Sequence, residues 1–234
     1  MIIRSNKPIE VVRIFGFREA EDSPDVISWS DPDHPDFSVL DKNFEGRAAA
    51  CGDFDNDGDL DLYVVYTGAA LNRANRLYEN RGGGDFVVVP GAAGAEGSQL
   101  GVGDGVSVAD YDQDGFLDLL VTNGAGIRPL TNDGPLQLFR NRGGNGNHWL
   151  QIDLVGSRDT RDAIGAIVRV TTASGTQRRD QTGGMTRATQ HHTRLHFGLG
   201  SDERVDRIEV TWPDGSQQEL RDVLADQILV IEQR

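Results

Sequence analysis

The chain contains two matching acidic stretches, Gly52-Asp53-Phe54-Asp55-Asn56-Asp57-Gly58-Asp59-Leu60-Asp61-Leu62 and Ala109-Asp110-Tyr111-Asp112-Gln113-Asp114-Gly115-Phe116-Leu117-Asp118-Leu119. Each is followed by a second matching stretch, Leu77-Tyr78-Glu79-Asn80-Arg81-Gly82-Gly83 and Leu138-Phe139-Arg140-Asn141-Arg142-Gly143-Gly144. Self-similarity of this kind is typical of repeat architectures. The middle of the chain therefore contains two copies of one unit: an acidic loop, an apolar strand, a variable linker, a short strand and a glycine turn.

The first acidic loop has the donor pattern of a site for a hard cation. Its first, third, fifth and ninth positions carry carboxylates: Asp53, Asp55, Asp57 and Asp61. Gly58 permits the backbone angle that folds the loop around an ion, and the carbonyl of Asp59 can then point inward. Oxygen donors at alternate positions suit calcium, whereas zinc and copper prefer histidine or cysteine, which the loop lacks. Magnesium remains an alternative that requires a stricter octahedron.

The second loop repeats the pattern, so the sequence predicts two calcium sites. Its carboxylates are Asp110, Asp112, Asp114 and Asp118. Gly115 takes the place of the glycine, and the carbonyl of Phe116 takes the place of the Asp59 carbonyl. An EF-hand does not fit, because its loop needs a glutamate at the twelfth position, where Val64 and Val121 stand.

Hydrophobic patterning predicts an all-β chain. Short β-branched or aromatic runs bounded by turn residues predict strands over 62–66, 86–89 and 119–122, and continuous apolar runs of this kind predict burial on both faces. Alternating patterns after Asn147 predict strands over 149–155, 164–170 and 207–212, and the chain closes with the strand 228–231, so residues 148–234 are expected to form an antiparallel β domain. A helical turn is expected only over 220–226. Residues 1–45 are expected to form an N-terminal β segment, with a degenerate repeat as the alternative.

Composition narrows the class of partner. The formal net charge of −14 disfavours nucleic acid and anionic membrane surfaces and favours cations. The single cysteine, Cys51, excludes an intramolecular disulfide. We expect no membrane span, because no apolar stretch is long enough, and no signal peptide, because the first ten residues lack the required apolar run.

The acidic loops and the stretches that follow them resemble FG-GAP (VCBS, integrin-type) repeats, in which such loops bind calcium between the strands of β-propeller blades. The C-terminal part resembles the ASPIC/UnbV domain of the cartilage acidic protein family and its bacterial relatives. The stretches that carry this second resemblance are Asn147-His148-Trp149-Leu150, Ala163-Ile164-Gly165-Ala166, His196-Phe197-Gly198-Leu199-Gly200 and Val210-Thr211-Trp212-Pro213-Asp214-Gly215. Thr160 departs from the pattern, since asparagine is expected there.

The resemblance implies a fold and a location. Residues 46–147 are expected to form two FG-GAP-like repeats, and residues 148–234 a sandwich-like ASPIC/UnbV domain. A propeller closes with about four to eight blades, so two repeats leave strand edges open. We therefore expect a partial propeller or one that a homo-oligomer completes by covering the edges. The alternatives are a fragment of a longer propeller and a smaller architecture built from the two repeats. The resemblance also implies an extracellular or periplasmic location.

Two functions follow as hypotheses, and a third interpretation is a purely structural fragment with no activity of its own. The first is a calcium-binding interaction or adhesion module, in which the ions rigidify the loops and a protein or glycan binds nearby. The second is a metal-dependent hydrolase of phosphate, phosphotriester or sulfate esters, with Asp59, His191 and His192 as its weak catalytic candidates. The absence of a recognisable nucleophile motif favours the first and leaves enzymatic activity open.

Overall fold

The structure, a computed structural model, describes residues 2–3, 12–13, 46–66, 74–83, 85–97, 102–124, 134–157, 160–186 and 189–234. The expectations for residues 1–45 lie outside these ranges, apart from β1 (Ile2–Ile3) and β2 (Val12–Arg13), which form an antiparallel pair.

The chain divides into two compact units, each built from three separate stretches. The first unit comprises Met1–Ala49, Asp61–Gly105 and Thr122–Leu136. The second comprises Ala50–Leu60, Val106–Val121 and Gln137–Arg234. The second acidic loop and the first eight positions of the first loop therefore belong to the same unit as the whole C-terminal region.

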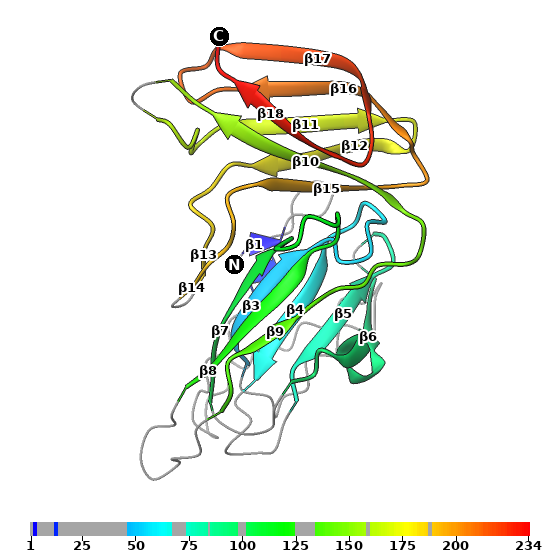
Figure 1. Cartoon of the computed structure of the whole chain (residues 1–234), viewed down its shortest axis with the longest axis vertical. Coiled ribbons are helices and arrows are strands. Elements are labelled where there is room, and N and C mark those ends of the chain that lie inside the picture. The colour runs from blue at the N-terminus through cyan, green and yellow to red at the C-terminus, as the bar shows by residue number, and fades with distance from the viewer. Residues whose placement is uncertain are drawn as a thin grey trace. The chain divides into compact units, whose positions relative to one another are not determined.

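The repeats form open sheets, as the all-β prediction requires. The first sheet has four strands in chain order: β3 (Gly46–Gly52), β4 (Asp61–Tyr66), β5 (Arg76–Asn80) and β6 (Phe86–Val89). The second sheet has three strands: β7 (Val102–Ala109), β8 (Asp118–Gly124) and β9 (Gln137–Phe139) (Figure 1). The first acidic loop joins β3 to β4, and the second joins β7 to β8. Neither sheet closes into a ring within the described residues.

Two local predictions for the repeats are confirmed. Every residue of β4 is buried, as its continuous apolar run predicts. β6 ends at Val89, since Pro90 cannot donate a ladder hydrogen bond, and Pro90 opens the short 3₁₀ segment η2 (Pro90–Gly94).

The C-terminal region forms a two-sheet sandwich, which we call the C-terminal sandwich. One sheet has the order β15-β10-β18, made of Leu195–Gly200, His148–Val155 and Gln227–Glu232. The other has the order β12-β11-β16-β17, made of Gly175–Asp180, Ile167–Thr172, Arg204–Thr211 and Gln217–Leu224. Figure 1 shows both sheets in the yellow-green to red part of the ribbon. A short hairpin, β13 (Met185–Thr186) and β14 (Thr189–Gln190), precedes β15.

One continuous apolar core fills the C-terminal sandwich. The fully buried members from its two sheets include Leu150, Ile152, Val168, Val170, Phe197, Val205, Ile208 and Val210. They alternate with more exposed residues along β11 and β16, which is the pattern of strands with one face on the core. All strand pairs of this sandwich are antiparallel except β10 with β18, which run parallel.

The prediction of a helical turn over 220–226 is wrong. Residues up to Leu224 extend β17, where Leu220 lies opposite Ile208 and Val223 opposite Val205. Cross-strand packing on β16 thus overrides the local helix preference. The strand expected over 164–170 begins only at Ile167, because residues 161–165 form turns that include Ala163 and Gly165 at positive φ.

Within the ranges that the structure describes, no helix has both the length and the apolar character that crossing a bilayer requires.

Candidate metal centres

The first acidic loop folds around its leading carboxylate. Asp53 accepts hydrogen bonds from two backbone amides of its own loop, Asp57 N at 3.1 Å and Gly58 N at 3.0 Å. Asn56 and Gly58 have φ of 60° and 102°, so the backbone twice enters the left-handed region to make the turn. The Asp57 carboxylate in turn accepts Asp59 N at 2.9 Å.

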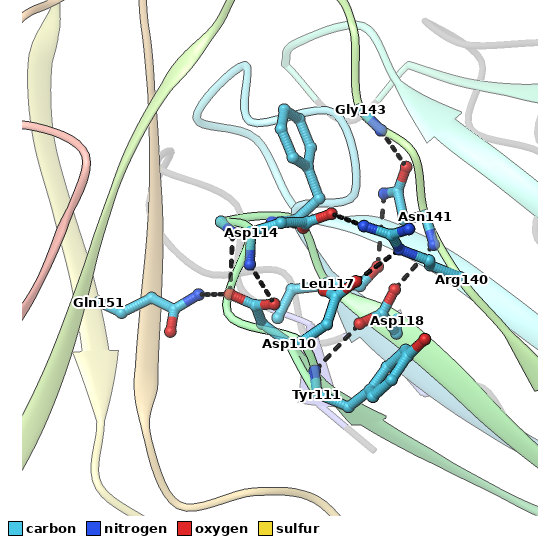
Figure 2. Close-up of polar contacts among 12 residues, drawn as sticks. Asp110, Tyr111, Asp114, Leu117, Asp118, Arg140, Asn141, Gly143 and Gln151 are labelled. Atoms are coloured by element: carbon cyan, nitrogen blue, oxygen red, sulfur yellow. Dashed lines mark hydrogen bonds and ion pairs between the residues drawn. The ribbon is translucent and has the colours of Figure 1, made fainter.

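The second loop has the same conformation. Asp110 accepts Asp114 N at 3.1 Å and Gly115 N at 2.9 Å, and Asp114 accepts Phe116 N at 3.1 Å (Figure 2). Gln113 and Gly115 have φ of 60° and 92°, at the positions that match Asn56 and Gly58. Because two different sequences adopt one conformation, the shared aspartates and glycine specify the loop.

The stretch that follows each loop holds the ninth-position aspartate. Asn80 N donates to Asp61 at 2.9 Å, and Asn141 N donates to Asp118 at 2.7 Å. The Asn80 and Asn141 side chains each accept an amide from the glycine two residues later. This explains why an asparagine and a glycine recur at a fixed spacing after both loops.

Three carboxylates gather in each loop. Oxygen atoms of Asp53, Asp55 and Asp57 lie within 4.8 Å of one another, as do those of Asp110, Asp112 and Asp118. Each cluster therefore has an all-oxygen donor set that can hold a metal ion of the hard class. Asp61 belongs to the first compact unit, whereas the three gathered carboxylates of its loop belong to the second.

Arg140 lies against the second loop. Its Nε is 2.5 Å from Asp112, and one terminal amine is 3.1 Å from Asp114 (Figure 2). The hydrogen bond to Asp114 and the charge of Asp112 raise the pKa of Arg140. The matching residue of the first repeat is Glu79, so the two repeats carry opposite charges at this position.

Burial changes the acidity of the loop carboxylates. Burial raises the pKa of Asp118 to about 6, and hydrogen bonds from Asn141 and Tyr111 oppose the rise. Burial and the neighbouring Asp57 raise the pKa of Asp59, while Arg179 lowers it. The ionised forms of Asp118 and Asp59 are thus costly without a compensating cation.

Strands of the C-terminal sandwich hold the leading aspartate of each loop. Gly198 N of β15 donates to Asp53 at 3.1 Å, and the Gln151 side chain of β10 donates to Asp110 at 2.7 Å. A Cβ at Gly198 would lie 2.1 Å from Asp53 Oδ2, so only glycine permits this approach. Trp149 similarly fills the space beside Gly115, where a Cβ would lie 1.9 Å from Nε1.

A cavity of about 200 Å³ lies beside these aspartates, within the second unit. Asp53, Asp110, His191 and His192 are among the residues that line it, whereas Asp59 is not. His191 Nδ1 accepts Val108 N, and His192 Nδ1 accepts Arg194 N, each at 3.0 Å. In the neutral state both imidazoles therefore carry their proton on Nε2. Burial lowers the pKa of His191.

Comparison with known families finds matches to two separate stretches of the chain. Residues 53–121 match the family described as FG-GAP-like repeat, and residues 156–234 match the family described as ASPIC and UnbV. The middle of the chain is therefore similar to FG-GAP-like repeats, and its C-terminal part is similar to the ASPIC and UnbV family. The order of the two regions is the one expected from the motifs quoted above, and the Asp53 and Asp110 loops both lie within the FG-GAP-like match.

Curated relatives carry the same name in three vertebrates. Cartilage acidic protein 1 of Homo sapiens is 35% identical over 172 residues, which cover 72% of this chain and 25% of the human protein. The Mus musculus protein is 35% identical over 172 residues, with 26% of its length covered, and the Xenopus tropicalis protein is 34% identical over 175 residues, also with 26% covered. The chain thus spans about a quarter of the length of these relatives.

Sequence reasoning missed the residues that hold the loops from outside. Gln151, Gly198 and Arg140 lie near an acidic loop in space but 26 or more positions from its carboxylate in sequence. The His196-Phe197-Gly198-Leu199-Gly200 stretch carried the ASPIC/UnbV resemblance and gave the one available signal. Its glycine in the middle of an apolar strand indicates a close backbone approach, and the structure identifies the approaching group as Asp53.

Proposed function

We propose that this chain is a calcium-binding interaction module of extracellular type, in which one Ca²⁺ in each acidic loop rigidifies the FG-GAP-like repeats. The observation that carries the proposal is the duplicated loop: two different sequences share the same amide-to-carboxylate bonds, and each gathers three carboxylates within 4.8 Å. Calcium matches this donor set because it accepts flexible oxygen coordination.

The proposal includes an architecture and a place of action. Residues 46–147 form the repeats, and residues 148–234 form the ASPIC/UnbV-like domain. Curated relatives named cartilage acidic protein support an extracellular or periplasmic location, where calcium is abundant. The ligand is a protein or a glycan, and a homo-oligomer covers the edges of the open sheets. Light scattering that finds only monomer at high concentration would exclude the oligomer.

Calcium removal tests the central claim. We expect EDTA to lower the melting temperature by about 10–20 °C, because an ion at about one hundred times its Kd contributes about 2.7 kcal/mol for each of the two sites. The measurement is a calorimetric melting scan with calcium and with EDTA. Asp55→Asn and Asp112→Asn, each of which removes one third-position charge, should each abolish part of the calcium-dependent shift.

The matched control is Asp206→Asn, which removes an exposed carboxylate of β16 outside both loops. Its calcium-dependent shift should equal that of the unmodified chain. Identical melting curves with and without EDTA would overturn the proposal.

Arg140 is expected to weaken calcium binding at the second loop. It contacts Asp112 and Asp114, so a calcium ion must displace or share this exposed charge. Arg140→Gln should raise the affinity of the second loop by about threefold or more, a modest effect because exposed ion pairs are weak. Isothermal calorimetry in the Asp55→Asn background measures the second loop alone. Arg142→Gln, a neighbouring exposed arginine, should leave the affinity unchanged.

A metal-dependent hydrolase is the second candidate function, favoured by the cavity that His191 and His192 share with Asp53 and Asp110. An ion held by either aspartate would polarise an ester oxygen at the cavity wall. The proposed substrates are phosphate, phosphotriester or sulfate esters. Activated esters of each class, assayed with and without calcium, separate the two functions. Calcium-dependent turnover that is lost in Asp53→Ala would favour the hydrolase, and its absence across the series would exclude it.

A further inference from the structure

The two acidic loops are joined by buried polar side chains of the C-terminal sandwich. Gln151 of β10 and His196 of β15 lie opposite each other in the antiparallel register of these strands. Both side chains are buried, with exposures of 1% and 8%. Buried polar groups are costly unless they are hydrogen-bonded, so the partners of these two residues reveal what they hold.

A path of hydrogen bonds runs from Asn56 through His196 and Gln151 to Asp110, and each bond determines which atom donates in the next. Asn56, which is fully buried, donates its amide to the carbonyl of Gly115 at 3.0 Å, so its Oδ1 is an acceptor. His196 Nε2 lies 2.7 Å from that Oδ1 and must therefore donate. His196 Nδ1 is then an acceptor for the Gln151 amide at 3.4 Å, and the same Gln151 nitrogen donates its other hydrogen to Asp110 at 2.7 Å.

The path starts and ends in the acidic loops. Asn56 is the fourth position of the first loop, and Gly115 is the sixth position of the second; both have positive φ and shape their turns. Asp110 is the leading carboxylate of the second loop. The side-chain oxygen of Gln151 accepts a hydrogen bond from the Arg194 guanidinium at 3.4 Å. Arg194 in turn donates two hydrogen bonds to Asp153. Gln151 therefore has a fixed position from which it orients both loops.

A network of this kind couples its ends. Outer-sphere hydrogen bonds orient metal ligands, and their loss typically costs about 10- to 100-fold in metal affinity. In a buried network, a shift of Asp110 toward an ion must move Gln151, and this displacement reaches Asn56 through His196. The Gly198 amide of β15 holds Asp53, and the Gly200 amide donates to the Asn56 carbonyl. With the His196 bond, the first loop is therefore bonded to β15 at three points.

We infer that the two loops bind their cations as one coupled site, with Gln151 and His196 as positioning residues for both ions. The inference rests on the proposed calcium binding and goes beyond it, because it makes the C-terminal sandwich part of the metal centre.

Calcium titration by isothermal calorimetry on the full chain tests the coupling. Asp112→Asn disables the second loop, and we expect it to lower the affinity of the first loop by about fivefold or more, the usual range of coupling between sites. Gln151→Met removes the link with a side chain of similar length. In the Gln151→Met background, Asp112→Asn should produce no further loss at the first loop. Gln227→Met on the adjacent strand β18 is the matched control and should preserve the coupling, because the Gln227 amide donates to the nearby Leu224 carbonyl and not to either loop within the described residues.

The outcomes separate the two proposals. If the unmodified chain binds no calcium, the proposed function fails. If it binds two ions and Asp112→Asn leaves the affinity of the first loop unchanged, calcium binding stands and the coupling is overturned. This second comparison needs no change at Gln151, so it decides the question even if Gln151→Met does not fold. Near-ultraviolet circular dichroism of each variant with calcium verifies that the sandwich core is intact.

Discussion

Replacing Gly198 by alanine is expected to destabilise the chain by at least about 3 kcal/mol, near the upper end for overpacking. A Cβ there would lie 2.1 Å from Asp53 Oδ2 and 2.5 Å from the Cα of Asn56. Asn56 cannot retreat cheaply, because its backbone is part of the turn and its carbonyl accepts Gly200 N at 2.8 Å. Asp53 is only 1% exposed, so it has no room to move, and in the variant it also loses its hydrogen bond from Gly198 N.

Thermal unfolding followed by circular dichroism measures this loss. A chain of this size loses about 2–4 °C of melting temperature for each kcal/mol, so a drop of about 10 °C is expected. Gly183→Ala is the matched control, since a Cβ at Gly183 meets nothing within 4 Å and its φ is not positive. Equal melting temperatures for the two alanine variants would show that β15 does not hold the first loop as described.

Acidification is expected to destabilise the chain through His196. Burial and then the nearby Arg179 lower the pKa of His196 to about 3, from 6.5 in the unfolded chain. Between these values the unfolded state binds the extra proton, so stability is intact above about pH 6.5 and falls with pH by up to about 1.4 kcal/mol per unit. From about pH 6.5 to about pH 4.5 the loss attributable to His196 should approach about 3 kcal/mol.

A matched variant isolates this contribution. His196→Gln keeps a donor for Asn56 but has no proton to gain, so its stability should fall less steeply with acid than that of the unmodified chain. Urea unfolding at several pH values gives the difference, in which the titration of the carboxylates cancels because both proteins contain them. His192→Gln, which changes an exposed imidazole, should retain the full dependence on pH. Parallel curves for His196→Gln and the unmodified chain would contradict a buried neutral His196.

Much of the fold could be predicted from the sequence, because the residue patterns that specify it lie within short stretches of the chain. The all-β class, the fully buried strand β4 and the end of β6 before Pro90 follow from apolar runs and a proline. The loop conformation follows from alternating aspartates and the glycines at 58 and 115, since these residues form the turn with bonds that span five positions or fewer. Where a local preference competed with pairing, as over 220–226, the prediction failed, because β16 supplies cross-strand contacts that local sequence does not contain.

The sequence by itself thus determined the repeated acidic loops, their oxygen-rich donor sets and the two families that these loops and the C-terminal region resemble. Only the tertiary structure decided what surrounds them: Arg140 on the second loop, Gly198 on Asp53, and the buried path from Asp110 through Gln151 and His196 to Asn56. The physical reason is distance along the chain. Asn56 and His196 are 140 positions apart, and no local periodicity encodes which buried donor will meet which acceptor once two strands pack against two loops.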